Sequence, residues 1–149
     1  MNDRIFIDTN ILVYAYTSGN IKKHETAKKF LQTSSDHCVI STQVINEFYV
    51  TLIKYKIEHD AICAAISEIT TLLCEVQPIG LETVHIALAM KKRYGFSYWD
   101  SLILSAALEY SCGLLYSEDI SDKQVICGNT LDNLNIKGSI LVNNPFLGV

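Results

Sequence analysis

The sequence has few features of secreted or membrane-spanning proteins. Its five cysteines are odd in number and include no Cys-x-x-Cys pair, which argues against a disulfide framework and against a zinc-binding cysteine cluster. No apolar run approaches the length of about 18 residues needed to cross a bilayer, and Arg4 and Asp8 interrupt any signal-peptide core near the start. We therefore expect a cytoplasmic protein with reduced thiols and no membrane contact.

Net charge, proline and glycine are also limited. Twelve Lys and Arg residues against 16 Asp and Glu residues give a formal charge of −4, which excludes a strongly basic nucleic-acid coat and a long acidic disordered tail. Only two prolines and seven glycines occur, with no linker composition and no repeat. With 49% hydrophobic residues, the sequence predicts a single domain over residues 1–149.

The sequence alternates short apolar runs with longer amphipathic segments. The short runs predict buried strands at residues 5–7, 38–40, 74–77, 114–116 and 140–142. Apolar residues at spacings of three and four predict helices at residues 11–16, 21–33, 43–56, 60–73, 81–94 and 97–110. Because parallel strands need crossover connections, this order predicts an α/β fold with a mainly parallel sheet covered on both faces. The polar stretch 120–138 has no clear pattern.

Several residues are expected to mark the ends of these helices. Asp60 and Ser97 are predicted to cap the helices that follow them, because their side chains accept hydrogen bonds from free backbone N–H groups. Gly95 and Gly113 are predicted to end helices, because glycine adopts the left-handed conformation without a steric penalty.

Four acidic residues occur where strands end or helices begin. Asp8 directly follows the first apolar run, and Asp119 follows the run at 114–116 after two polar residues. Asp100 lies in the first turn of one predicted helix, and Glu47 lies about one turn into the predicted helix that begins near Thr42. Because ligands of open parallel sheets bind beyond the carboxyl ends of the strands, these four side chains are expected to meet at one edge.

Each acid also has a simpler explanation. Asp8 can cap the helix after it, and Asp100 fits a capping box that begins at Ser97. Glu47 could be an exposed helix residue, and Asp119 could begin a turn. Four unrelated caps and turns have no reason to fall at the same sheet edge, which favours a shared site.

A shared acidic site needs positive charge. Like charges about 4 Å apart repel by several kcal/mol at the effective dielectric of a protein surface. Four carboxylates with no lysine or arginine in the same motifs are expected to hold Mg²⁺ or Mn²⁺. The expected chemistry is metal-assisted hydrolysis, in which one ion activates a water and a second stabilises the leaving oxygen. Thr9 and Ser117, beside two of the acids, can hydrogen-bond to a carboxylate or a phosphate.

Five segments form an ordered pattern from the first strand to the C-terminus. They are Ile5–Leu12, Ser41–Phe48, Tyr98–Ile103, Leu115–Asp119 and Asn144–Phe146. The ordered set resembles the PIN-domain ribonucleases, most closely the small VapC-type toxins of bacterial toxin–antitoxin pairs. The resemblance implies a PIN-like three-layer sandwich, with Asp8, Glu47, Asp100 and Asp119 as the metal-binding catalytic acids and Thr9 and Ser117 as auxiliary hydroxyls.

The resemblance also implies an activity and partners. Proteins of this group are endoribonucleases that use Mg²⁺ or Mn²⁺, often on tRNA or ribosomal RNA. They commonly form homodimers and are inhibited by an antitoxin that covers the acidic groove. The region after Asp119 is longer and more polar here than in the family, and Asp122 within it is a candidate auxiliary acid, with an exposed loop carboxylate as the alternative.

Basic and aromatic residues are candidates for contacts with RNA. The basic candidates are Lys22, Lys23, Lys54, Lys92 and Arg93. Lysines on exposed helix faces more often only solvate the surface. Tyr98 and Trp99 could stack on a base, but an aromatic pair at the start of a core helix is expected to pack inward.

Three other functions remain open at this point. One is a PIN nuclease that acts in RNA processing or on DNA without an antitoxin. A second is a non-catalytic nucleic-acid-binding module on the same fold, which the presence of all four acids disfavours. The third is an aspartyl phosphatase, which needs a second aspartate two residues after Asp8, where this chain has Asn10.

Overall fold

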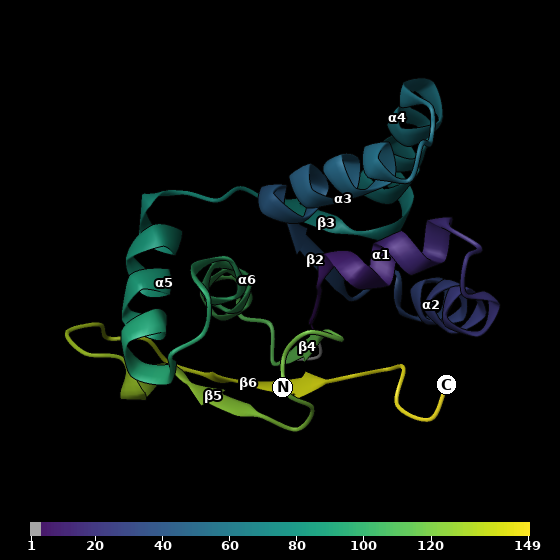
Figure 1. Cartoon of the computed structure of the whole chain (residues 1–149). Coiled ribbons are helices and arrows are strands. Elements are labelled where there is room, and N and C mark those ends of the chain that lie inside the picture. The colour runs from purple at the N-terminus through teal and green to yellow at the C-terminus, as the bar shows by residue number, and fades with distance from the viewer. Residues whose placement is uncertain (1–3) are drawn as a thin grey trace.

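A six-stranded sheet forms the centre of the computed structural model, which describes residues 4–149. The strands are β1 (Ile5–Ile7), β2 (Cys38–Ser41), β3 (Glu75–Gln77), β4 (Leu114–Tyr116), β5 (Val125–Cys127) and β6 (Ser139–Asn143). Their order across the sheet is β3-β2-β1-β4-β6-β5, and all neighbours are parallel except β5 and β6 (Figure 1). The predicted mainly parallel sheet is confirmed.

Helices cover both faces of this sheet. They are α1 (Thr9–Tyr16), α2 (Ile21–Ser34), α3 (Thr42–Lys54), α4 (His59–Glu68), α5 (Leu81–Tyr94) and α6 (Tyr98–Glu109). Figure 1 shows α5 and α6 on one side of the sheet and α1 and α2 on the other, which confirms the predicted three-layer α/β arrangement. No helix in residues 4–149 has the length and apolar character needed to cross a membrane.

Two predicted helix boundaries are confirmed by local hydrogen bonds. Gly95 has φ +78°, and its N–H donates to the Lys91 carbonyl at 2.8 Å, so α5 ends in a left-handed cap. The Ser97 hydroxyl oxygen accepts the N–H of Asp100 at 3.1 Å and begins α6. The two caps restrict the backbone conformation of the short connection between α5 and α6, which places Asp100.

Three other predicted boundaries are wrong. Helix α4 begins at His59 rather than after a cap at Asp60. Asp60 lies inside the first turn of this helix. That helix also does not continue regularly to residue 73, because Ile69–Leu73 form a π-helix, η1. The left-handed residue predicted at Gly113 is instead Ser111, which adopts φ +61° just after the end of α6.

The stretch without a sequence pattern, 120–138, contains β5 and a 3-10 turn, η2 (Gly128–Thr130). The strand β5 pairs antiparallel with β6, Val125 opposite Leu141. Ile126 is fully buried whereas Val125 is 53% exposed, so only one side chain of this short strand clearly faces the core.

The two central strands position the segments that follow them. Ile5–Ile7 of β1 pair in parallel with Leu114–Tyr116 of β4, and Phe6, Ile7 and Leu115 are fully buried. The ladder continues by one step, because the N–H of Asp8 donates to the Tyr116 carbonyl at 3.0 Å. Residues after β1 and after β4 therefore leave the sheet side by side at its carboxyl edge.

The close packing of η2 can be tested by Gly128→Ala. An added Cβ would lie 2.7 Å from Cγ2 and 2.8 Å from the carbonyl oxygen of Ile136, so we expect a loss of about 1–3 kcal/mol in the free energy of unfolding, measured with urea. The control Gly19→Ala, where an added Cβ meets nothing within 4 Å, is expected to change it by less than about 0.5 kcal/mol. Equal effects of the two variants would contradict this packing.

Candidate active site

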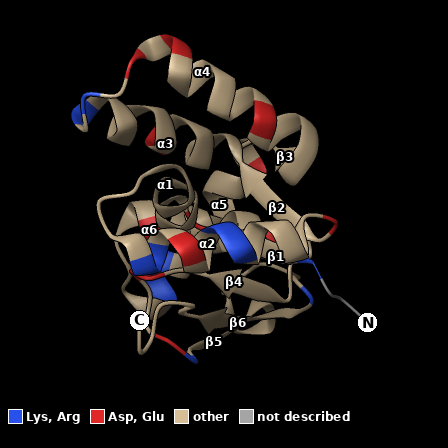
Figure 2. Ribbon diagram, turned by 90° about the vertical axis from the view of Figure 1, so that its right-hand side faces the viewer, with Lys and Arg blue, Asp and Glu red and all other residues tan. Residues whose placement is uncertain are grey.

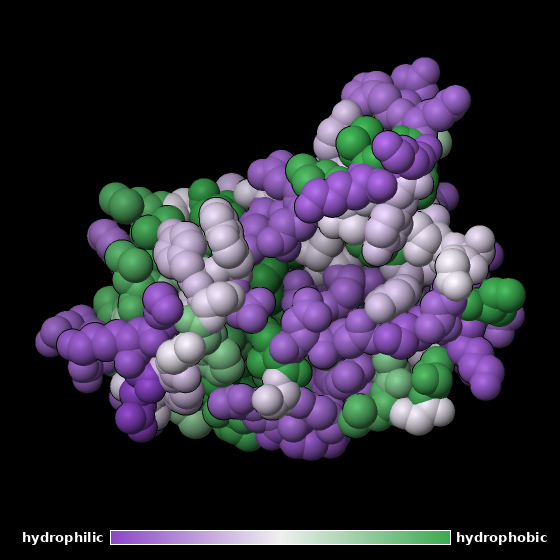
Figure 3. Space-filling view, viewed as in Figure 1, coloured by the Kyte–Doolittle hydropathy of each residue, from purple (hydrophilic) through white to green (hydrophobic). Residues whose placement is uncertain are grey.

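Four acidic side chains line one pocket of about 550 Å³ at the carboxyl edge of the sheet. They are Asp8, Glu47, Asp100 and Asp119. Asp8 follows β1, Asp119 follows β4, and the other two come from α3 and α6. The structure thus brings together the four acids that the sequence analysis placed at one edge. Figure 3 shows the surface indented in the region between α1, α3 and α6, with hydrophilic and hydrophobic residues around it.

Asp8 is the most buried of the four, with 4% of its surface exposed. Its Oδ1 accepts the N–H of Thr9 at 2.7 Å, and its Oδ2 accepts the hydroxyl of Ser117 at 2.7 Å. Asp8 is therefore the N-cap of α1 and also a pocket residue. Burial raises its pKa from the ordinary value of 3.8 to about 7, the hydrogen bonds oppose this rise, and the charges of Asp119 and Glu47 add to it.

Glu47 is half-buried and held from two helices. The hydroxyl of Thr9 donates to its Oε1 at 2.7 Å. The side-chain amide of Gln43 donates at 3.4 Å to Oε2 and at 3.1 Å to the carbonyl of Trp99. The amide of Gln43 therefore ties the acid on α3 to the start of α6.

Asp119 is exposed and is held by Asn10 of α1. The side-chain amide of Asn10 donates to Asp119 Oδ2 at 3.0 Å, and its carbonyl oxygen accepts the N–H of Glu118 at 3.4 Å. The N–H of Asp119 also donates to the hydroxyl of Ser117 at 3.1 Å. Asn10 and Ser117 thus fix the turn after β4 against the start of α1.

Asp100 lies in the first turn of α6 and is half-buried. Its pKa is raised, first by burial and then by the charges of Asp119 and Glu47, while a hydrogen bond with Ser97 lowers it. The N–H of Asp100 is capped by Ser97, so the simpler helix-start explanation is also correct in part. A local cap and a place in the acidic pocket coexist at this residue, as they do at Asp8.

Sequence reasoning missed several residues that support the pocket. They are Asn10, Tyr14, Gln43 and Glu118. The Asp-Thr-Asn triplet was a signal for Asn10, and the spacing of four residues from Glu47 was a signal for Gln43. Tyr14 and Glu118, in contrast, meet across 104 positions. Tyr14 donates to Glu118 Oε1 at 2.7 Å, and Lys23 forms an ion pair with the same carboxylate.

The basic candidates for RNA contacts lie in different places. Lys54 lines the acidic pocket. Lys23 is engaged with Glu118, and its ammonium lies 4.9 Å from the centre of the Tyr14 ring. The remaining candidates are exposed on α2 and α5, outside the lining of this pocket: Lys22, Lys92 and Arg93. Figure 2 shows basic residues on α2 among neutral and acidic ones.

Two further residues differ in their placement from the sequence analysis. Asp122 does not line the pocket, and its Oδ1 accepts the N–H of Asn144 at 2.8 Å, which connects its loop to the end of β6. Trp99 lines the pocket and is 62% exposed, so the inward packing expected for it is wrong. Its ring meets that of Tyr98 edge to face, with centroids 5.4 Å apart.

The pocket offers oxygen ligands to a divalent cation. Within residues 4–149, no group of three His, Cys, Asp or Glu side chains is arranged to enclose an ion by itself. Mg²⁺ commonly takes only one or two carboxylates and keeps several waters, so such a group is not required. Acidic charges that raise the pKa values of Asp8 and Asp100, beside neutral hydroxyl and amide groups, fit a hard cation.

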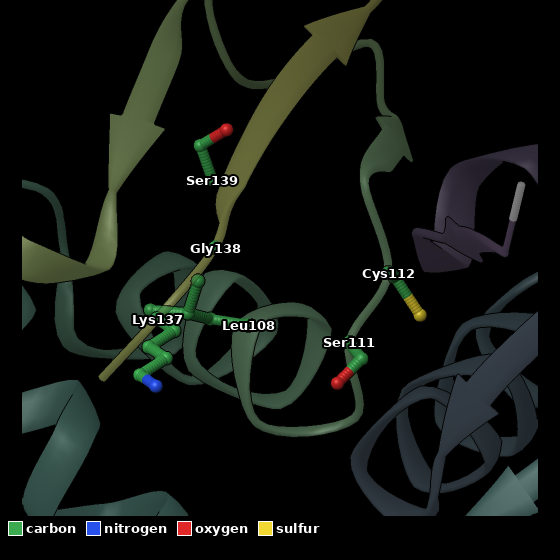
Figure 4. A pocket seen from close by; sticks show the side chains of 6 residues that line it. All are labelled: Leu108, Ser111, Cys112, Lys137, Gly138 and Ser139. Atoms are coloured by element: carbon green, nitrogen blue, oxygen red, sulfur yellow. The ribbon is translucent and has the colours of Figure 1, made fainter. Parts of the chain in front are cut away.

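A smaller cavity of about 250 Å³ lies at the opposite edge of the sheet, near the start of β6 and the end of α6 (Figure 4). Its lining residues are Leu108, Ser111, Cys112, Lys137, Gly138 and Ser139. None of them is acidic, so this cavity does not share the chemistry of the carboxyl edge.

Fold and pocket together define an α/β protein with an acidic, oxygen-lined site at the carboxyl edge of a mainly parallel sheet. The sequence profile of the PIN domain matches residues 5–124, and the chain belongs to the PIN-domain family. PIN-domain proteins of the VapC type are nucleases, and nucleases of this family generally use divalent metal ions. No curated protein matches the sequence.

Solved structures of toxin–antitoxin proteins share this fold. VapC20 of Mycobacterium tuberculosis, described as a sarcin-ricin loop cleaving toxin, is 20% identical over 77% of this chain and 91% of its own, with a TM-score of 0.64. A toxin–antitoxin complex from Klebsiella pneumoniae is 22% identical over 95% of this chain and 98% of the other, with a TM-score of 0.66. VapBC2 from Rickettsia felis, bound to a DNA fragment from its promoter, is 18% identical over 94% and 97%, with a TM-score of 0.62.

The raised pKa of Asp8 predicts a pH-dependent effect of Asp8→Asn on stability. The unfolded carboxyl ionises near 3.8 and the folded one near 7, so the metal-free wild type loses stability as the pH rises between these values. Asn stays neutral. In EDTA, the stability gained by Asp8→Asn should therefore grow by about 2–4 kcal/mol from pH 4 to pH 7 and then level off. Urea unfolding at several pH values measures this, and a difference between the two proteins that does not change with pH would contradict it.

Proposed function

We propose that the chain, as one nuclease domain over residues 1–149, is a divalent-metal-dependent endoribonuclease and the toxin of a toxin–antitoxin pair. Its substrate would be a structured RNA such as tRNA or ribosomal RNA. The observation that carries this proposal is the convergence of four carboxylates from four separate elements in one pocket, with neutral donors holding them in place. Membership of the PIN-domain family supports it.

Mg²⁺ or Mn²⁺ would be held by some of the four acids, Asp8, Glu47, Asp100 and Asp119. When bound, the ion lowers the pKa of water and stabilises negative charge that develops on a phosphate. The chain's own residues orient the acids. Hydroxyl and amide groups donate to three of the carboxylates without neutralising them, so the negative charge remains available for a cation.

The proposed partners are an antitoxin protein and a second copy of the chain. The similar solved structures include a toxin–antitoxin complex and VapBC2, which supports a protein that binds and inhibits this one. Homodimer formation, expected from the family resemblance, can be checked by light scattering during gel filtration.

The activity is tested by incubating total cellular RNA with the purified protein in Mg²⁺, Mn²⁺ or EDTA and mapping the ends formed. We expect discrete fragments from the wild type with either metal, and a loss of at least about 100-fold in cleavage rate for Asp8→Asn, since a pocket acid acts on the transition state. The exposed Asp36→Asn serves as the control and should cleave normally. Asp122→Asn distinguishes an auxiliary acid, which would lose activity, from a loop contact.

Two results would redirect the proposal. Cleavage of DNA but not of RNA would indicate a PIN nuclease of another kind. No cleavage of either nucleic acid across a full metal titration, with any bound inhibitor excluded by mass spectrometry, would contradict a nuclease and favour a binding function.

Metal binding is tested separately by thermal unfolding. A cation that binds only the folded acids stabilises the protein by mass action, so 10 mM Mg²⁺ is expected to raise the melting temperature of the wild type by about 2–4 °C if the dissociation constant is near 2 mM. Asp119→Asn should show a smaller rise, because one ligand charge is lost. The exposed Asp36→Asn should match the wild type. An equal rise in all three proteins would indicate non-specific binding of the ion.

A further inference from the structure

Trp99 is an unusual residue in the wall of the acidic pocket. It is the only tryptophan of the chain, it is 62% exposed, and it immediately precedes Asp100 in the first turn of α6. An exposed indole is a large apolar surface left in contact with water, and such a surface beside a polar site marks a place where a ligand can be bound.

Neighbouring residues hold the backbone that carries this indole. The backbone carbonyl of Trp99 accepts the side-chain amide of Gln43 at 3.1 Å, and the same amide contacts Glu47. The edge of one ring in the Tyr98–Trp99 pair faces the other, with an interplanar angle of 69°. The exposed aromatic surface is therefore presented from the first turn of a capped helix rather than from a loose loop.

We propose that Trp99 forms a nucleobase subsite, in which the indole stacks on one unpaired base of the RNA next to the phosphate held at the acids. This inference rests on the proposed nuclease function and adds a feature of the substrate, an unpaired base, that the pocket recognises. Trp99 and Asp100 are consecutive residues lining one pocket, so a phosphate at Asp100 brings its attached nucleotide within reach of the indole.

Other residues that line the pocket suit the same ligand. Lys54 and Tyr55, at the end of α3, and Val50 one turn earlier all line the pocket and are exposed. Lysine can pair with a phosphate of the strand, and an aromatic or apolar wall accepts a base. The volume of about 550 Å³ lies within the usual range for pockets that hold a small-molecule-sized group.

Stacking also limits the form of RNA that can be bound. A base inside a duplex has both faces covered by its neighbours, whereas a base in a loop, a bulge or a single strand can be turned out onto an aromatic side chain. The subsite therefore favours cleavage next to an unpaired base. Because every base has a π face, the subsite should accept all four bases without strict sequence specificity. Purines should bind more tightly than pyrimidines, because they stack more strongly.

The single tryptophan makes the subsite directly observable. The Asp8→Asn protein in Mg²⁺, which avoids turnover, is titrated with three 12-residue probes: single-stranded oligo(A), oligo(U) and a sugar–phosphate oligomer without bases. Tryptophan emission reports stacking, and polarisation of a labelled end reports binding. We expect quenching by oligo(A), weaker quenching by oligo(U), and none by the abasic oligomer even where it binds.

Substitutions identify the side chain responsible. In the same Asp8→Asn background, Trp99→Ala is expected to weaken the binding of oligo(A) by about tenfold, whereas Trp99→Phe, which keeps an aromatic face, should stay within about threefold. The control is Leu81→Ala on α5, which removes a 72% exposed apolar side chain outside the pocket and should change nothing. In the otherwise wild-type enzyme, Trp99→Ala should raise KM about tenfold with kcat within about threefold.

The outcomes separate this proposal from the nuclease proposal. Equal affinity for oligo(A) and the abasic oligomer, or unchanged affinity after Trp99→Ala, overturns the subsite even if the wild type cleaves RNA. The exposed indole would then be assigned to contact with a protein partner. Quenching by oligo(A) with no cleavage of RNA by the wild type overturns the nuclease and leaves the base-binding subsite in place.

Discussion

The burial of the Asp8 carboxylate between the ends of the two central strands is the constraint on which the rest of the site depends. An ionised group removed from water is costly, and two hydrogen bonds to Asp8 offset part of that cost. One comes from Thr9 in α1 and the other from Ser117 after β4. The contacts that make the buried charge tolerable therefore also join the elements that form the pocket.

Neutral donors also hold two of the other acids. Their partners on the protein are neutral donors, the Thr9 hydroxyl for Glu47 and the Asn10 amide for Asp119. A neutral donor orients a carboxylate and leaves its charge intact, whereas a lysine or arginine at the same place would cancel it. The nearby ammonium of Lys23 is engaged by Glu118 instead. The arrangement stores repulsion that a cation relieves, at the expense of stability in the metal-free state.

Much of the fold and the acid set could be predicted because their signals are local. Asp8 and Asp119 are recognisable as polar residues that follow short apolar runs, and Gly95 as the end of a helix. The rest depends on contacts between distant parts of the chain. Asn10 meets its partner across 109 positions, and the exposure of Trp99 follows from the shape of the pocket rather than from its neighbours in sequence. Ser111 shows that a local rule can also fail, because the left-handed residue after α6 is this serine rather than the glycine two positions later that the rule indicated.

The link between the first turn of α1 and the turn after β4 has a consequence for synthesis of the chain on the ribosome. Domains acquire their contacts as the chain emerges from its N-terminal end. A nascent chain from which β1, α1 and α3 have emerged contains Asp8 and Glu47. It still lacks Ser117 and Asp119, and the strand β4 that places them beside β1. The complete acid set therefore exists only after about four-fifths of the sequence, through Asp119, has been translated, so a shorter nascent chain lacks the complete pocket.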